Sequence, residues 1–231
     1  MNDLLNQLIT QVDANVEQPR GAKKLDYVLL DASGSMISRW QESLNAIDQY
    51  VKGVKDAEVD TKLVMATFSG GYEMEYSVVR NNAVTVWSPL APEPPHCPGG
   101  GTPLYDAINI MVRAIREENP DECSIVIVTD GEENGSRTTN ETQARALLDW
   151  CRSKGWQVTF IGADFNNSRL AKSLGGGGAT AIGAPTKRLT DITSELAKKR
   201  GYHSKFGTPM HFSEEERKQF GGYLSDQSGG K

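Results

Sequence analysis

Three short polar segments of the sequence, DASGS, GGGTP and TDG, contain side chains that could bind a divalent cation. In the first segment, Asp31, Ser33 and Ser35 occupy alternate positions of a loop, so that their oxygen atoms can face one point. Thr102 of the second segment adds a hydroxyl group, and Asp130 of the third adds a second carboxylate. Two carboxylates and three hydroxyls form an all-oxygen set, which is typical of sites for Mg²⁺ or Mn²⁺. Taken singly, the Ser-Gly-Ser turn and Thr102 could each cap a helix instead.

The elements around these segments alternate between strands and helices. Apolar runs predict strands at residues 25–31, 61–68, 123–131, 156–164 and 179–183, with two shorter and more polar strands at 72–80 and 83–87. Helical spacing of apolar residues predicts helices over residues 36–54, from about 103, at 140–154, at 167–174 and at 186–200. This alternation predicts an α/β fold, a doubly wound and mostly parallel sheet with helices on both faces.

Open sheets of this kind bind ligands beyond the carboxyl ends of their strands. Asp31 ends one predicted strand and Asp130 lies at the end of the most apolar one, while the GGGTP segment opens a helix. We therefore expect the three segments to converge at one edge of the sheet. The loop 88–101 and the segment 132–137 are expected to surround the site.

The three segments, in this order and spacing, resemble the metal-ion-dependent adhesion site of von Willebrand factor A-type domains. The family pattern D-x-S-x-S, then Thr, then Asp, is matched at all five positions, and the resemblance covers about residues 22–200. It implies a six-stranded sheet in the order 3-2-1-4-5-6 with one short antiparallel edge strand. It also implies that Ser33 and Ser35 bind the metal directly. Thr102, Asp31 and Asp130 would then bind either directly or through water.

Domains of this family are usually protein-interaction modules, in which an Asp or Glu of the partner completes the coordination of the metal. The resemblance thus implies a protein partner with an acidic side chain and no enzymatic activity. One alternative is an architectural subunit of a large assembly, such as a virion or a complex with an AAA+ ATPase, whose metal site is structural. A Mg²⁺-dependent phosphatase is less favoured, because Ser33 stands where those enzymes carry a second acid.

Composition narrows the class of protein further. The 231 residues include 25 basic and 30 acidic side chains, a formal charge of −5, so the basic excess of a nucleic-acid-binding protein is missing. No apolar run is long enough to span a membrane, and the first residues lack the basic start of a secretory signal. We therefore expect a cytoplasmic protein that binds neither nucleic acid nor membrane. Its three cysteines lack metal-binding spacing and are expected to be reduced.

Two extensions flank the predicted domain at residues 22–200. In residues 1–21, the spacing of Leu4, Leu5, Leu8 and Val12 suits an amphipathic helix. Residues 201–231 are predicted to form a polar tail, within which Ser213 and Glu216 have the spacing of a capping box for a short helix.

Overall fold

The computed structural model describes residues 22–90, 98–131, 133–164, 168–177 and 180–221. Its strands are β1 (Lys24–Asp31), β2 (Lys62–Gly70), β3 (Met74–Ala83), β4 (Glu122–Thr129), β5 (Gln157–Ala163) and β6 (Ala181–Ala184). Its α-helices are α2 (Trp40–Asp56), α3 (Leu104–Glu118), α4 (Glu141–Ser153), α5 (Ser168–Ser173), α6 (Leu189–Phe206) and α7 (Glu214–Gly221). Short 3₁₀ helices are η1 (Gly34–Arg39), η2 (Val84–Val86) and η4 (Thr186–Arg188).

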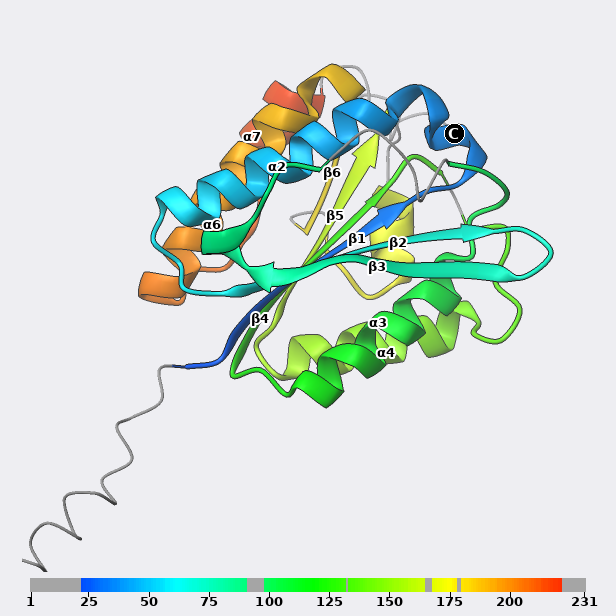
Figure 1. Ribbon diagram of the computed structural model, residues 1–231, viewed down its shortest axis with the longest axis horizontal. Helices are drawn as coiled ribbons and strands as arrows, with labels where there is room; N and C mark the ends of the chain where they lie inside the picture. The colour runs from blue at the N-terminus through cyan, green and yellow to red at the C-terminus, as the bar shows by residue number, and fades with distance from the viewer. Residues whose placement is uncertain (1–21, 91–97, 132, 165–167, 178–179, 222–231) are drawn as a thin grey trace, which may run out of the picture.

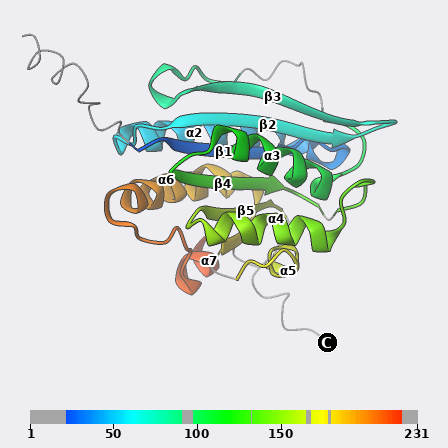
Figure 2. The same ribbon diagram turned by 90° about the horizontal axis from the view of Figure 1, so that it is seen from below.

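The six strands form one sheet in the order β3-β2-β1-β4-β5-β6. Figure 2 shows β3 at the upper edge of this sheet, followed by β2, β1, β4 and β5. β3 is antiparallel to β2, with a bulge at Met65/Ala66, and every other pair is parallel. The predicted α/β fold and the strand order implied by the family resemblance are thus confirmed.

Successive residues of the central strands point to opposite sides of the sheet, so apolar side chains lie on both faces. Helices cover both faces and bury these side chains. On one face, Val28 and Leu30 of β1 pack in a core with α2 and α6. On the other face, Tyr27 and Leu29 pack in a second core with α3, α4 and α5. Figure 1 shows α2 and α6 on one side of the sheet and α3 and α4 on the other. This two-sided burial explains why β1 and β4 read as continuous apolar runs.

The prediction of two polar strands at 72–80 and 83–87 is wrong in part. A single strand, β3, covers Met74–Ala83, and the next three residues form the 3₁₀ helix η2. The chain leaves the strand there because Val84 turns into the core, where 2% of it is exposed, and its N–H donates to the carbonyl of Thr61 at 3.1 Å. The edge strand is accordingly longer than the short one that the family resemblance implied.

The boundary expected at residue 200 lies inside a helix, since α6 continues to Phe206. Beyond it, Met210 and Phe212 are each 1% exposed and belong to the same core as α2. The predicted capping box is present at the start of α7, where Ser213 Oγ accepts from Glu216 N at 3.1 Å and Glu216 Oε2 accepts from Ser213 N at 2.6 Å. Residues 201–221 therefore pack on the domain, which corrects the prediction of a polar tail for this part. The predicted helix within residues 1–21 lies outside the described residues.

No helix in the described part of the chain is long and apolar enough to cross a membrane. Cys123 and Cys151 are both buried and unpaired, and burial raises the pKa of the Cys151 thiol to about 12. Burial also raises the pKa of the Cys123 thiol well above its usual value, so neither thiol is ionised at neutral pH.

Candidate metal centre

The carboxyl ends of β1 and β4 lie side by side in the middle of the sheet. Leu30 of β1 is in register with Val128 of β4, and Asp31 and Asp130 follow shortly after them. Strand β1 pairs with β2 on one side and with β4 on the other. The chain therefore continues from β1 toward one edge of the sheet, and from β4 toward the opposite edge. The edge above β1 and β4 is thus a topological switch point, where ligands of open α/β sheets bind.

Asp31 is fully buried and has both carboxylate oxygens in hydrogen bonds. Oδ1 accepts from the backbone N–H of Ser33 at 2.8 Å, and Oδ2 accepts from the hydroxyl of Thr129 at 2.6 Å. Burial raises the pKa of this carboxyl group, the two hydrogen bonds oppose the shift, and the nearby charge of Asp130 adds to it. The bond to Ser33 fixes the loop after β1 in a tight turn.

A chain of hydrogen bonds joins the two serines to the second aspartate. Ser33 Oγ lies 3.2 Å from Ser35 Oγ, and the Ser35 hydroxyl donates to Asp130 Oδ1 at 2.7 Å. Ser33 is 1% exposed, whereas Ser35 is open to solvent. The structure therefore brings together four of the five residues that the sequence singled out: Asp31, Ser33, Ser35 and Asp130. Asp31 is joined to the others by its hydrogen bond from Ser33.

The glycine segment that carries Thr102 crosses directly over the turn after β1. Gly34 N donates to the carbonyl of Gly100 at 3.0 Å, and Gly70 and Gly101 exchange two backbone hydrogen bonds of 2.7 and 2.9 Å. Gly100 has a φ of +71°, and a Cβ there would lie 1.5 Å from the Gly70 carbonyl oxygen. Glycine is required at this position because the two backbones approach too closely for any side chain.

Thr102 does not cap the helix that follows it, so that alternative interpretation is wrong. The N-cap of α3 is Pro103, which makes no side-chain cap hydrogen bond. The backbone N–H of Thr102 donates to Asn134 Oδ1 at 2.8 Å. Thr102 is 3% exposed, and among the described residues its hydroxyl has no hydrogen-bond partner. A hydroxyl without a protein hydrogen-bond partner is free to bind a ligand.

The start of α3 is capped instead by Glu133, from the segment after β4. Its carboxylate accepts from the backbone N–H of Tyr105 at 3.0 Å and from those of Gly135 and Ser136 at 2.8 and 2.6 Å. A negative charge at a helix N-terminus is stabilising. Glu133 was expected to surround the site, and the structure assigns it this structural role. Glu132, also expected there, lies outside the described residues.

Arg39 is the residue near the site that sequence reasoning missed. Its guanidinium pairs with Asp130 Oδ2 at 3.1 Å, donates to the Ser35 carbonyl at 2.8 Å, and pairs with Asp164 Oδ2 at 3.0 Å. Although burial alone would raise it, hydrogen bonds from Thr186 and the charge of Arg39 lower the pKa of Asp164. Arg39 and Asp164 are 125 positions apart, so no local pattern could have linked them.

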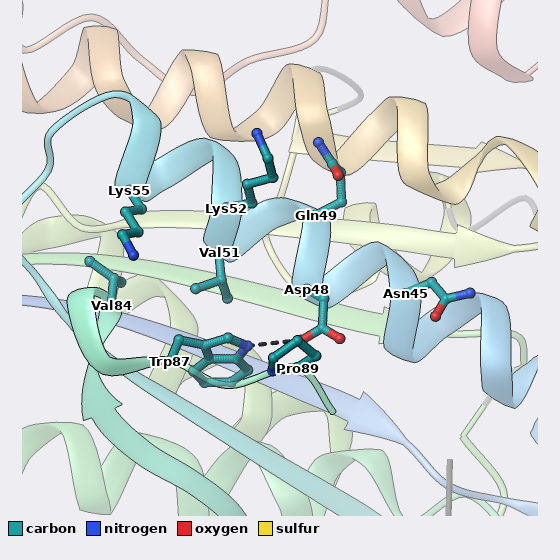
Figure 3. Close-up of a pocket in the computed structure, with 9 residues that line it drawn as sticks. All are labelled: Asn45, Asp48, Gln49, Val51, Lys52, Lys55, Val84, Trp87 and Pro89. Atoms are coloured by element: carbon teal, nitrogen blue, oxygen red, sulfur yellow. Dashed lines mark hydrogen bonds between the residues drawn. The ribbon is translucent and has the colours of Figure 1, made fainter. Parts of the chain in front are cut away.

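The loop leading toward Gly99 is held at its near end by Asp48 of α2, as Figure 3 shows. Asp48 accepts from the indole N–H of Trp87 at 2.9 Å and from the backbone N–H of Leu90 at 2.9 and 3.1 Å. Trp87 lines a pocket of about 380 Å³ beside α2, together with residues that include Val51, Lys52 and Lys55. Residues 91–97, expected to surround the metal, lie outside the described residues.

The side chains at this edge fit a hard cation. Within the described residues, no three His, Cys, Asp or Glu side chains gather to hold a metal, and the set at this edge is one of hydroxyls and carboxylates. Ser33, Ser35 and Asp130 offer side-chain oxygens linked by contacts of 2.7 and 3.2 Å, and Asp31 adjoins them through the hydrogen bond from the Ser33 backbone N–H. Hydroxyl and carboxylate oxygens suit Mg²⁺ or Mn²⁺ and do not suit a soft metal.

Comparisons with known proteins agree with the fold. The pilus adhesin SpaC from Lactobacillus rhamnosus GG matches with a TM-score of 0.64 and 12% identity over 80% of this chain and 31% of its own. The vWF domain of the pili tip protein Mfa5 from Porphyromonas gingivalis matches with a TM-score of 0.60 and 10% identity over 81% of this chain and 98% of its own. Manganese-loaded TRAP protein from Plasmodium vivax matches with a TM-score of 0.50 and 14% identity over 74% and 72%.

This chain thus spans about a third of the length of the pilus adhesin. Among curated proteins, no sequence matches the chain significantly. The family model for the von Willebrand factor type A domain matches residues 27–195, which is most of the chain. The matched range includes all five candidate metal ligands, which are Asp31, Ser33, Ser35, Thr102 and Asp130. The chain therefore belongs to the von Willebrand factor type A domain family.

Proposed function

We propose that the chain is a metal-ion-dependent protein-binding module. In this proposal Asp31, Ser33, Ser35, Thr102 and Asp130 hold a divalent cation, Mg²⁺ or Mn²⁺, and a carboxylate of the partner completes its coordination. When bound, the cation supplies a positive charge that attracts this carboxylate. The two serines bind it directly, while the aspartates and Thr102 bind directly or through water.

The hydrogen-bonded chain from Ser33 through Ser35 to Asp130 is the observation that carries the proposal. It aligns three side-chain oxygens at the switch point of the sheet, with Asp31 fixed below them. Ser35 is open to solvent, so an external group can approach the ligand set. If these side chains served only to pack the loop against the sheet, the Ser35 hydroxyl would not have to be accessible to solvent.

Exposed apolar side chains near this edge suit contact with a protein partner. Ile37 lies two residues after Ser35 and is 65% exposed, and Tyr72, in the β2–β3 turn, is 94% exposed. That turn is joined to the Thr102 segment by the Gly70–Gly101 hydrogen bonds, and the guanidinium of Arg137 donates to the Tyr72 carbonyl at 3.1 Å. A partner with an acidic residue flanked by apolar side chains matches this surface.

A binding module is favoured over an enzyme, because Ser33 stands where Mg²⁺-dependent phosphatases carry a second acid. Pilus proteins and TRAP among the structural neighbours support the same class of function. Because those neighbours include pilus proteins, the cytoplasmic location expected from the sequence stays a prediction. The architectural alternative requires a site that holds its cation without any partner carboxylate.

Selection from a displayed peptide library tests the proposal. Peptides are bound to the full chain in Mg²⁺ and eluted with EDTA, and each one is remade with its Asp or Glu changed to Asn or Gln. We expect every selected peptide to carry an acidic residue and to lose binding in the amide version. Ser35→Ala should abolish capture, whereas Ser38→Ala, an exposed serine of the same 3₁₀ helix, should not. Peptides that bind equally well in EDTA would refute a metal-dependent site.

A further inference from the structure

A second pocket lies at the opposite end of the sheet from the metal site, where β4 and β5 begin. This tryptophan pocket has a volume of about 310 Å³ and is lined by Arg116, Pro120, Asp121, Trp150, Lys154 and Trp156. Arg116 comes from the last turn of α3, and Trp150 and Lys154 from the end of α4 and the residue after it. The side chains facing this pocket play no part in the metal site.

Two indoles and two cations line the tryptophan pocket, beside Asn119, Pro120 and the carboxylate of Asp121. The rings of Trp150 and Trp156 meet edge to face, with centroids 5.2 Å apart, and Trp156 is 6% exposed. Arg116 Cζ lies 5.0 Å and Lys154 Nζ 5.7 Å from the centroid of Trp150. Both cations are exposed, and neither forms a salt bridge with any residue of the described ranges. The pocket therefore presents unpaired positive charge beside an aromatic surface, which suits an acidic and apolar occupant.

The amino-terminal segment leaves the domain at this same pocket. Asp121, one of its lining residues, accepts from the backbone N–H of Lys23 at 2.7 Å, and its own N–H donates to the Lys23 carbonyl at 2.9 Å. Residues 1–21 contain three acidic side chains and one basic side chain, together with several aliphatic ones. Glu17 precedes Lys23 by six residues, so an extended chain allows it to lie up to about 20 Å from Lys23. That reach is ample for a pocket that Asp121 itself lines.

We propose that residues 12–21 fold back onto the tryptophan pocket, with Glu17 pairing with Arg116 and Lys154 and the side chains of Val12 and Val16 covering the Trp150 indole. The occupant is this segment of the same chain. Its charge is complementary to that of the pocket, and its attachment at Lys23 gives it a high effective concentration there. This contact is independent of the proposed metal site.

Hydrogen exchange of the full chain, read by mass spectrometry, tests the proposal. In the parent protein, amides of residues 12–21 should exchange at least about tenfold more slowly than in the variant R116E/K154E. Adding Glu17→Lys to that double variant reverses both charges of the pair and should restore the protection. Lys172→Glu reverses an exposed cation on α5 that forms no salt bridge with any described residue. It is the matched control and should leave the exchange unchanged.

Two results would overturn the inference. Exchange of residues 12–21 at the rate of a free peptide in the parent protein would mean that the segment does not dock. Protection that increases with protein concentration would assign the pocket to the segment of a second copy, not to the same chain. Circular dichroism of each variant separates these outcomes from a loss of folding.

Discussion

Replacing Arg200 by Met should destabilise the fold strongly, because it removes one half of a fully buried ion pair. Arg200 of α6 and Asp26 of β1 are both 0% exposed, with Arg200 Nε 2.7 Å from Asp26 Oδ1. Arg200 also pairs with Glu122 at the start of β4. Methionine fills much of the same volume, but within the described residues it leaves the Asp26 carboxylate with a single hydrogen bond, from the Tyr50 hydroxyl at 3.2 Å.

Removing one partner of a buried ion pair typically costs about 3–5 kcal/mol of unfolding free energy. The cost at Asp26 must depend on pH. Burial already raises the pKa of Asp26, and the charge of Arg200 is the strongest influence that lowers it. In the variant the pKa of Asp26 is therefore higher still. Above the ordinary value of about 3.9, the folded state then holds a proton that the unfolded state has lost, so stability falls as pH rises.

Urea unfolding followed by circular dichroism at pH 5 and pH 8 measures both effects. We expect R200M to lose about 3–5 kcal/mol at pH 8 and distinctly less at pH 5. Adding Asp26→Asn to R200M removes the unpaired charge and should recover part of the loss. Arg113→Met, at an exposed arginine of α3, is the control and should change stability by less than about 0.5 kcal/mol. A loss from R200M below about 1 kcal/mol, or one that is equal at both pH values, would refute the reasoning.

Three further predictions concern the metal site and the segment beside it. Arg39→Gln should tighten Mg²⁺ binding roughly fivefold, since it removes a partly exposed cation that lies 3.1 Å from Asp130 Oδ2. Calorimetry measures the affinity, and weaker binding in this variant would mean that Arg39 positions Asp130 as a ligand. Thr102→Ala should weaken binding of a selected acidic peptide more than it weakens binding of the metal, as titrations of each ligand would show; equal losses would contradict a role specific to the partner-bound state. Glu133→Ala should cost about 1–2 kcal/mol, because it leaves the N–H groups of Tyr105, Gly135 and Ser136 without their acceptor; an unchanged melting temperature would count against Glu133 as the cap of α3.

Much of the site could be predicted from the sequence because its parts are local. Asp31, Ser33 and Ser35 lie within one turn after a strand, and the backbone bond from Ser33 to Asp31 spans two residues. Asp130 was predicted from a strand end alone, since parallel strands place their carboxyl ends on one edge. The alternating elements likewise predicted the sheet and its helices.

Other features depend on contacts between distant parts of the chain. Arg39 reaches Asp164 of another strand end, and Glu133 rather than Thr102 caps α3, and neither contact has a local signal. The segment after residue 200 is polar on average, so Met210 and Phe212 carried too little periodicity to indicate a packed chain. They are buried because they pack against the core between the sheet and the helices α2 and α6, and that core forms only in the folded domain.

Calorimetric titration of the metal-stripped full chain with Mg²⁺ and with Mn²⁺ tests the central claim most directly. We predict saturable one-to-one binding in the parent protein that is lost in Asp31→Ala and in Ser35→Ala. Ser35 is exposed, so its variant should keep the fold even if Asp31→Ala does not. Asp60→Ala, which removes an exposed acid outside the site, should bind as the parent does. Absence of binding in the parent, or binding that both site variants retain, would contradict a metal centre at the ends of β1 and β4.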